Sequence, residues 1–269
     1  MTSSTNQLLK PITLKTNDNG NLSIGGCDLT ELAEKYGTPL YVLDEETIRA
    51  ICRDYKKAFS KYEKVRMMYA SKALCTMGTS VLISSEGFGF DVVSGGEIYT
   101  LHKAGIDMSN VLFNGNNKSI DELNLALDLG VGRISVDNFL ELSLLNELAK
   151  SKNLVANILL RITPGIECHT HEYIQTGHLD SKFGFDLTQI DEAVDLILNT
   201  YSNLKLHGLH AHIGSQIFET KVYHDEIEIL IKELSRLDEK FDLKLDEINI
   251  GGGLGVKYTE KEVQPSTYE

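Results

Sequence analysis

The sequence of 269 residues lacks any CxxC pair and any apolar run that approaches the roughly 18–20 residues of a membrane span. Its amino terminus has no charged segment followed by an apolar one, so we expect no secretory signal. The four cysteines, Cys27, Cys52, Cys75 and Cys168, are therefore interpreted as reduced thiols rather than as a disulfide framework or a zinc site. This cysteine usage predicts a cytoplasmic location.

Positive charge is also scarce, because 26 Lys and Arg stand against 39 Asp and Glu, which gives a formal net charge of −13. Nucleic acids and anionic membranes are bound by basic surfaces, so the acid excess argues against both classes of partner. It still permits a local basic pocket for a phosphorylated small molecule. The hydrophobic fraction of 42% is sufficient for a sizeable core and excludes global disorder.

From residue 44 onward, segments with strand character alternate with segments whose apolar residues recur at helical spacing. The expected strands cover 65–70, 88–93, 111–115, 133–137, 155–162, 204–213 and 246–250. The expected helices cover 44–60, 73–84, 96–104, 119–130, a segment that begins at 138, 190–198 and 223–234. Ser119 and Glu122 form a capping-box pattern at the start of one of these helices.

Repeated βα units predict an α/β fold in which helices cover a parallel sheet, and seven units in a row favour a TIM-type (β/α)8 barrel over an open sheet. Residues 39–44 have the pattern of an extended strand that belongs to another layer or domain. We therefore divide the chain into an N-terminal segment, 1–43, and a barrel, 44–269. The connection 163–187 interrupts the alternation, and connections of this length are usually functional.

Functional groups of parallel barrels lie at the carboxyl ends of the strands. Lys72 follows the first expected strand directly. Burial at such a position lowers the pKa of an amine and makes it available for a Schiff base with a carbonyl compound or with pyridoxal phosphate. The alternative is an ordinary surface lysine at the end of a strand.

His210 and His212 fall two residues apart at the end of the sixth expected strand, where the period of a strand puts them on one face. Such a pair suits a divalent metal, and one imidazole could equally stack on a flat cofactor ring. The alternative is two histidines at the edge of the core.

Gly251, Gly252 and Gly253 follow the seventh expected strand, and their backbone N–H groups suit a phosphate. The run is not a dinucleotide fingerprint, because Val256 stands where that pattern needs glycine, and it lacks the glycine before Lys257 that a P-loop requires. A plain turn is the alternative. A lysine anchor, a ring-stacking histidine and a phosphate loop are together the parts of a pyridoxal phosphate site.

Three motifs resemble those of the fold-type III, alanine-racemase-like decarboxylases that depend on pyridoxal phosphate. They are Tyr-Ala-Ser-Lys-Ala at 69–73, His-Ile-Gly-Ser-Gln at 212–216 and Gly-Gly-Gly-Leu-Gly at 251–255. Two further stretches, 113–119 and 170–177 with the following 181–184, resemble the diaminopimelate decarboxylase branch of that family. The resemblance covers essentially the whole chain, and it implies a barrel of the alanine racemase kind.

The resemblance implies that Lys72 holds pyridoxal 5'-phosphate through a Schiff base and that His212 stacks on its ring. It further implies that Ser215 and the amides around Gly252 and Gly253 bind the phosphate.

The same resemblance implies that Asp91 and Arg161 line the pocket and that 163–184 shapes its entrance. The reaction that it implies is decarboxylation of meso-2,6-diaminopimelate, a small-molecule amino acid, to L-lysine and CO2, in a homodimer of the full-length protein.

Members of this family run well past this length, with an eighth strand and an antiparallel β domain into which the N-terminal segment folds. The Glu-Pro-Gly-Arg motif, the Cys-Glu-Ser motif and the late tyrosine that complete the family's site are absent from the 269 residues. We therefore expect an incomplete barrel of seven units. We also expect the chain alone to be marginally stable and inactive.

Three alternatives stay open at this point. One is another fold-type III decarboxylase, of the ornithine, arginine or carboxynorspermidine type. The second is a metal-dependent hydrolase barrel that uses His210 and His212 with His169 or His171. The third is a non-catalytic homologue, against which the presence of Lys72 argues.

Overall fold

The computed structural model describes residues 5–165 and 182–268. The chain divides into two compact units. The first comprises Met1–Met67, Leu82–Phe88 and Val256–Glu269, and the second comprises Met68–Val81 and Gly89–Gly255. The predicted boundary after residue 43 stays a prediction.

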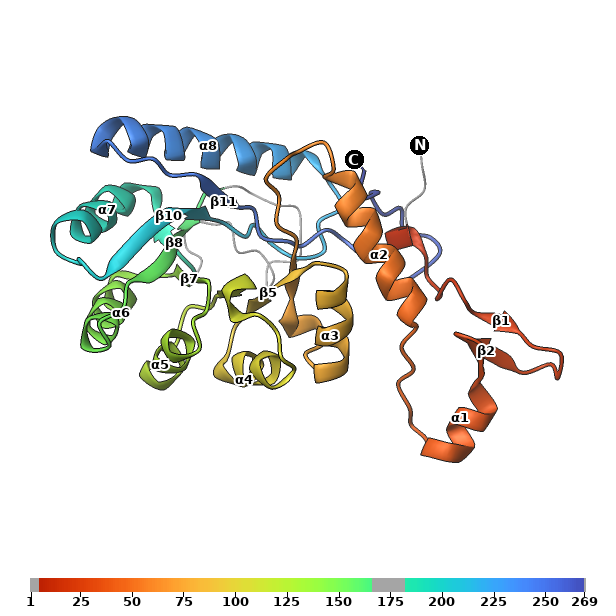
Figure 1. Ribbon diagram of the computed structural model, residues 1–269. Coiled ribbons are helices and arrows are strands. Elements are labelled where there is room, and N and C mark those ends of the chain that lie inside the picture. Colours follow the sequence, from red (N-terminus) through yellow and green to blue (C-terminus); the bar gives the residue numbers. More distant parts are fainter. Residues whose placement is uncertain (1–4, 166–181, 269) are drawn as a thin grey trace. The chain divides into compact units, whose positions relative to one another are not determined.

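The second unit contains a parallel sheet with the strand order β11-β10-β8-β7-β6-β5-β4, and β9 pairs with β8 outside this path (Figure 1). The strands are β4 (Met68–Ala70), β5 (Gly89–Val92), β6 (Val111–Phe113), β7 (Arg133–Val136), β8 (Ala156–Thr163), β9 (Phe185–Asp186), β10 (Leu204–His210) and β11 (Glu247–Asn249). The seven strands of the path follow the chain order, as expected for successive βα units. The predicted incomplete barrel is therefore confirmed.

Burial along the strands explains why apolar runs predicted them. All three residues of β6 are buried and β8 is buried at all but one position, as in a parallel strand covered on both faces. The two strands that end the path, β4 and β11, have no fully buried residue. The core of this unit therefore lies around the middle of the sheet.

Helices connect the strands and lie beside the sheet (Figure 1). Their bounds are α3 (Met77–Ser85), α4 (Gly95–Lys103), α5 (Ile120–Asp128), α6 (Phe139–Ser151), α7 (Ile190–Asn199) and α8 (Lys221–Phe241). Short 3-10 turns add η2 (Ser71–Ala73), η3 (Met108–Asn110) and η5 (Leu187–Gln189). α3 begins in the second unit and ends in the first.

The predicted capping box at the start of α5 is confirmed. The Ser119 hydroxyl accepts a hydrogen bond from the Glu122 backbone N–H, and the Glu122 carboxylate accepts one from the Ser119 backbone N–H. At the start of α6, the Asn138 side chain accepts from the Glu141 backbone N–H. Glu141 does not close a second box, because its carboxylate lies against other partners that are described below.

The first unit contains a small antiparallel sheet with the order β1-β2-β3 and two helices. Its elements are η1 (Thr5–Gln7), β1 (Lys15–Thr16), β2 (Leu22–Ile24), β3 (Cys27–Asp28), α1 (Leu29–Tyr36) and α2 (Glu45–Ala58). The strand predicted at 39–44 is wrong, because no residue of that range belongs to a strand. Tyr41 is 98% exposed and Leu43 is 55% exposed, so this apolar stretch has no layer to pack against.

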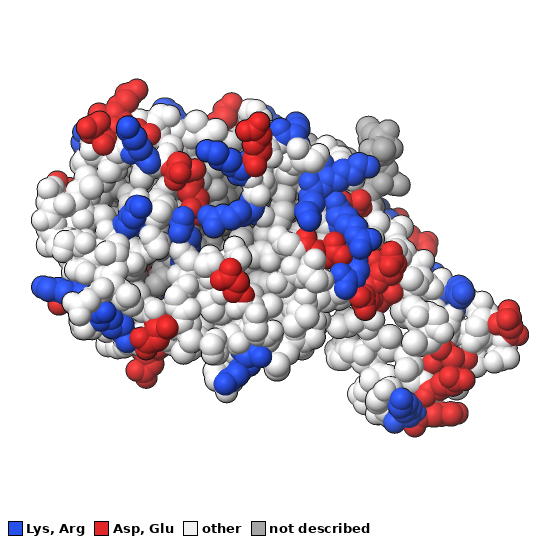
Figure 2. All heavy atoms as spheres, in the orientation of Figure 1, with Lys and Arg blue, Asp and Glu red and all other residues white. Residues whose placement is uncertain are grey.

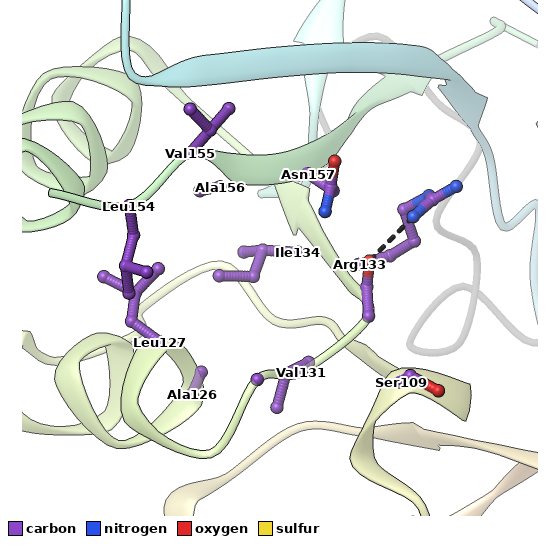
Figure 3. A pocket seen from close by; sticks show the side chains of 12 residues that line it. Ser109, Ala126, Leu127, Val131, Arg133, Ile134, Leu154, Val155, Ala156 and Asn157 are labelled. Carbon is purple, nitrogen blue, oxygen red and sulfur yellow. Dashed lines mark hydrogen bonds between the residues drawn. The ribbon is translucent and has the colours of Figure 1, made fainter.

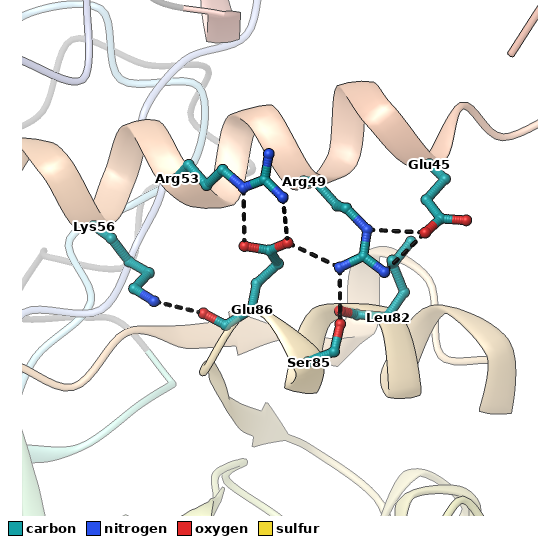
Figure 4. Close-up of polar contacts among 7 residues, drawn as sticks. All are labelled: Glu45, Arg49, Arg53, Lys56, Leu82, Ser85 and Glu86. Carbon is teal, nitrogen blue, oxygen red and sulfur yellow. Dashed lines mark hydrogen bonds and ion pairs between the residues drawn. The ribbon is translucent and has the colours of Figure 1, made fainter.

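Glu86 fixes the segment after α3 to α2 within the first unit (Figure 4). Its carboxylate accepts hydrogen bonds from Arg49 at 2.8 Å and from Arg53 at 3.1 Å. Its backbone carbonyl accepts one from Lys56 Nζ at 2.9 Å. The hydrogen bonds from the two arginines lower the pKa of Glu86.

None of the described helices combines the length and the apolar content that crossing a bilayer requires. On the face that Figure 2 shows, Lys and Arg side chains are mixed with Asp and Glu side chains.

Candidate functional site

The carboxyl ends of the parallel strands bring the predicted site residues to one edge of the sheet. Ala70, two residues before Lys72, is the register partner of Asp91. Arg161 on β8 is likewise the register partner of His210 on β10, two residues before His212. Residues far apart in the sequence thus come from neighbouring strand ends, as the barrel interpretation requires.

Lys72 lies in η2, directly after β4, and its residue is exposed. The neighbouring Ser71 is buried, so the turn itself is anchored in the unit. Burial raises the pKa of Asp91, and the positive charge of Lys72 opposes this rise. Burial lowers the pKa of His212, and the charge of Lys72 lowers it further. The amine therefore shares one electrostatic environment with both predicted pocket residues.

Asp91 on β5 is an acidic group that interacts with the charges of Lys72 and Arg161. Burial raises its pKa to about 6, and the hydrogen bond from Asn114 together with the charges of Lys72 and Arg161 opposes that shift. Asn114 Nδ2 donates to Asp91 Oδ2 at 3.0 Å. Asn114 therefore stabilises the charged form of this carboxyl group.

Arg161 is 6% exposed and lies near the end of β8. Its Nη1 lies 3.9 Å from Asp137 Oδ1, and its guanidinium carbon lies 4.2 Å from the centre of the Phe183 ring. Burial lowers the pKa of Arg161, and the charges of Asp137 and Asp91 oppose this effect. A guanidinium group keeps its charge even so, and the aromatic face holds it in a fixed plane.

His212 is neutral at physiological pH. Burial, followed by the charges of Lys72 and Arg161, lowers its pKa to about 4. Its Nδ1 accepts a hydrogen bond from the Gly252 backbone N–H at 3.3 Å, so a neutral ring with an unprotonated Nδ1 fits this contact. The ring is thus tied to the glycine run, and an uncharged imidazole suits stacking on a flat ring.

The loop that contains the glycine run after β11 has a backbone conformation that requires glycine at one position. Gly253 has φ +103°, and a Cβ there would overlap the carbonyl oxygen of Gly214. A Cβ on Gly252 would meet no atom within 4 Å, so this position faces open space. Ile217 N–H donates to the Gly253 carbonyl at 2.9 Å, which holds the loop against the segment that contains Ser215. The loop offers backbone amides beside room for a ligand, as a phosphate cradle requires.

The histidine pair does not form a metal site within residues 5–165 and 182–268. β10 ends at His210, whose Nδ1 lies 2.8 Å from the Ser135 hydroxyl and whose side chain is buried. Those residues contain no group of three or more His, Cys, Asp or Glu side chains arranged for a metal. His169 and His171, named with the metal alternative, lie outside the described residues.

Sequence reasoning missed a buried ion pair next to the site. Lys118 Nζ lies 2.7 Å from Glu141 Oε1, with side chains that are 1% and 6% exposed. It also missed the contact of Phe183 with Arg161. Lys118 belongs to the motif at 113–119, but no local pattern in the sequence signals a pairing between residues of two different βα units.

A cleft at the opposite end of the sheet is separate from this site (Figure 3). It measures about 280 Å³ and lies at the amino ends of β7 and β8, between Val131, Ile134 and Leu154 among others. Its one cationic side chain, Arg133, pairs with Glu247 at 2.9 Å and donates to the Gly132 carbonyl. Its lining is mostly apolar, and its arginine already has partners.

Residues 45–269 match the family described as "Pyridoxal-dependent decarboxylase, pyridoxal binding domain". The chain belongs to this family. Among curated relatives, the diaminopimelate decarboxylase of Synechocystis sp. is 46% identical over 99% of the chain. The diaminopimelate decarboxylase of Bacillus subtilis is also 46% identical, over 93% of the chain.

Solved structures of pyridoxal-dependent decarboxylases agree with the fold. Diaminopimelate decarboxylase from M. jannaschii, in complex with L-lysine, aligns with a TM-score of 0.88 at 34% identity over 97% of the chain. The Helicobacter pylori enzyme, also complexed with L-lysine, aligns with a TM-score of 0.84 at 32% identity over 90% of the chain.

The match does not extend over the whole of these relatives. The chain spans 58% of the Synechocystis protein and 57% of the Bacillus subtilis protein. It spans 61% of the M. jannaschii chain and 60% of the Helicobacter pylori chain.

Proposed function

We propose that the protein carrying this chain decarboxylates meso-2,6-diaminopimelate to L-lysine and CO2, with pyridoxal phosphate bound at Lys72. The observation that carries the proposal is the convergence of Lys72, Asp91, Arg161 and His212 at one edge of the sheet. Identity of 46% to two diaminopimelate decarboxylases supports the choice of substrate.

The residues present fit pyridoxal phosphate. A primary amine at Lys72 matches the aldehyde, and the open space beside Gly252 leaves room for the phosphate. We assign phosphate binding to Ser215 and to the amides around Gly252 and Gly253. When bound, pyridoxal phosphate supplies an electron sink for the pair of electrons that departing CO2 leaves behind.

His212 would support the ring of the cofactor. Its pKa of about 4 keeps the imidazole uncharged at pH 7, so it adds no positive charge beside the ring. The hydrogen bond from Gly252 to Nδ1 couples the orientation of the imidazole to the phosphate loop.

Arg161 and Asp91 would set the charge around the amine. Arg161 keeps a buried positive charge that attracts a carboxylate, while Asp91 offers a carboxyl group with a pKa of about 6. Lys72 Nζ would hold the cofactor through its aldehyde carbon and, as a free ammonium group, would supply the proton that replaces CO2 at the reacting carbon.

The test measures CO2 released from meso-diaminopimelate by the protein that carries this chain. We expect release that depends on pyridoxal phosphate and falls at least about 1,000-fold in Lys72→Ala, because the covalent anchor is lost. Lys152, whose side chain is 25% exposed and pairs with Asp128 at 2.6 Å, provides the control Lys152→Ala with unchanged release. Release from L-ornithine or L-arginine but not from meso-diaminopimelate would overturn the substrate assignment.

Two further points stay predictions. The described cysteines Cys27, Cys52 and Cys75 are free thiols, which supports the proposed cytoplasmic location. The proposed homodimer rests on the family resemblance.

A further inference from the structure

Lys118 and Glu141 form a buried ion pair in which each side chain also contacts the backbone. Lys118 Nζ donates to the carbonyls of Gly115 and Ser135, each at 2.7 Å, in addition to its contact with Glu141 Oε1 at 2.7 Å. Glu141 Oε2 accepts a hydrogen bond from the Asp137 backbone N–H at 3.0 Å. Three acceptors thus surround an ammonium group that has three N–H donors.

Such a pair is not an efficient source of stability. Removing two charges from water costs about as much as their attraction returns, and apolar replacements of similar volume are often equally stable. Burial accordingly lowers the pKa of Lys118 and raises the pKa of Glu141, while each charge opposes the shift of the other. Lys152 and Asp128 form a pair of the same chemistry that is more accessible to solvent, since their side chains are 25% and 58% exposed.

The pair bonds the backbone at Gly115, Ser135 and Asp137, and the first and last of these points flank the candidate site. Gly115 directly follows Asn114, which donates to Asp91. Asp137, whose N–H is bound to Glu141, lies 3.9 Å from Arg161 through its own carboxylate. Lys118 therefore holds the residue next to Asn114, which contacts Asp91, and Glu141 holds Asp137, which contacts Arg161.

We propose that the Lys118–Glu141 pair is a positioning element, which holds Asn114 against Asp91 and Asp137 against Arg161 and thereby sets the charge around Lys72. The proposal rests on the proposed function for its meaning in catalysis. The contacts on which it is based are all between residues of this chain.

The test replaces the pair with apolar side chains in the double variant Lys118→Met/Glu141→Leu. This change removes one positive and one negative charge, so the net charge of the region stays the same. The matched control is the more accessible pair, Lys152→Met/Asp128→Leu. Circular dichroism and urea unfolding establish that each variant is folded.

The first measurement follows the carboxyl carbon of Asp91 by 13C NMR in the cofactor-free chain across pH 4 to 9. In the unaltered chain we expect the midpoint near pH 6, the pKa to which burial raises Asp91. We expect the double variant to move it upward by about one pH unit, because the displaced Asn114 no longer stabilises the carboxylate. The control keeps the midpoint of the unaltered chain.

The second measurement is the affinity for pyridoxal phosphate, followed by its absorbance. We expect about tenfold weaker binding in the double variant, the loss typical of one or two orienting hydrogen bonds, and no change in the control. A folded double variant with an unchanged Asp91 midpoint and unchanged affinity would overturn the positioning role.

A shifted midpoint in a chain that never binds pyridoxal phosphate would support the positioning role and contradict the proposed function instead. If the double variant does not fold, Lys118→Met takes its place, because it removes the donor that holds the Gly115 carbonyl beside Asn114. The same upward shift is expected there, and an unchanged midpoint overturns the proposal.

Discussion

Two acids of this chain whose pKa values are raised differ in their partners. Asp91 has Asn114, Lys72 and Arg161 to oppose the effect of burial, and its pKa rises only to about 6. Glu226 on α8 is 0% exposed, neither carboxylate oxygen has a hydrogen-bond partner among the described residues, and its pKa rises to about 8. The first acid belongs to the candidate site, and the second is a cost to stability.

Glu226 makes the stability of the chain depend on pH. Its pKa is about 8 in the folded chain and near 4.5 when unfolded, so its stabilising effect is complete below pH 4.5 and is lost as the pH rises toward 8. The neutral variant Glu226→Gln does not titrate. We expect it to match the parent near pH 5 and to exceed its free energy of unfolding by roughly 3–5 kcal/mol at pH 8.

Urea unfolding at pH 5, 6.5 and 8 measures this difference. Glu228→Gln on the same helix is the control, because the Glu228 side chain is 70% exposed and should give no comparable pH slope. Parallel pH profiles for Glu226→Gln and the parent would show that Glu226 is charged and solvated in the folded chain.

Single residues were predictable from the sequence where a strand end placed them. Lys72 and His212 stand directly after apolar runs, so position alone marked them as candidates. Glu141 was predicted only to start a helix, and its role as the partner of Lys118 could not be derived. Pairing between two βα units depends on their tertiary arrangement, which no local spacing encodes.

At the scale of elements, buried strands were the most predictable feature. β6, β7 and β8 fall inside the expected ranges or within one residue of them, because continuous apolar character accompanies burial on both faces. The range 39–44 has similar character, yet it forms no strand, since an extended segment also needs a partner strand. Apolar composition therefore predicts that a segment is buried, but it does not predict whether the segment pairs with a neighbouring strand.

The glycine loop after β11 gives a prediction at this scale. Gly253→Ala is expected to destabilise the chain by about 2 kcal/mol or more, because its φ is +103° and its Cβ would overlap Gly214. Gly252→Ala is the matched comparison, since its Cβ meets nothing within 4 Å. We expect its stability to change by less than about 0.5 kcal/mol, while pyridoxal phosphate binds about tenfold more weakly.

Urea unfolding and absorbance titration with pyridoxal phosphate separate the two effects. Equal stability of the two variants would show that the loop is free to rearrange. Unchanged affinity in Gly252→Ala would place the phosphate elsewhere.

At the scale of the whole molecule, the sheet order explains why seven separated strands supply one site. The order follows the chain from β4 to β11, so every carboxyl end lies at the same edge of the sheet. The sequence alternation was sufficient to predict this arrangement and the incomplete barrel. It was not sufficient to predict the small antiparallel sheet β1-β2-β3, whose strands have only two or three residues.

The most direct test of the account is the covalent attachment of pyridoxal phosphate to Lys72. The chain is incubated with pyridoxal phosphate, reduced with borohydride, digested and mapped by mass spectrometry, alongside Lys72→Ala and Lys152→Ala. We predict one dominant adduct on Lys72 in the unaltered chain and in Lys152→Ala, and its loss in Lys72→Ala. Labelling spread evenly over exposed lysines, unchanged by Lys72→Ala, would contradict the account.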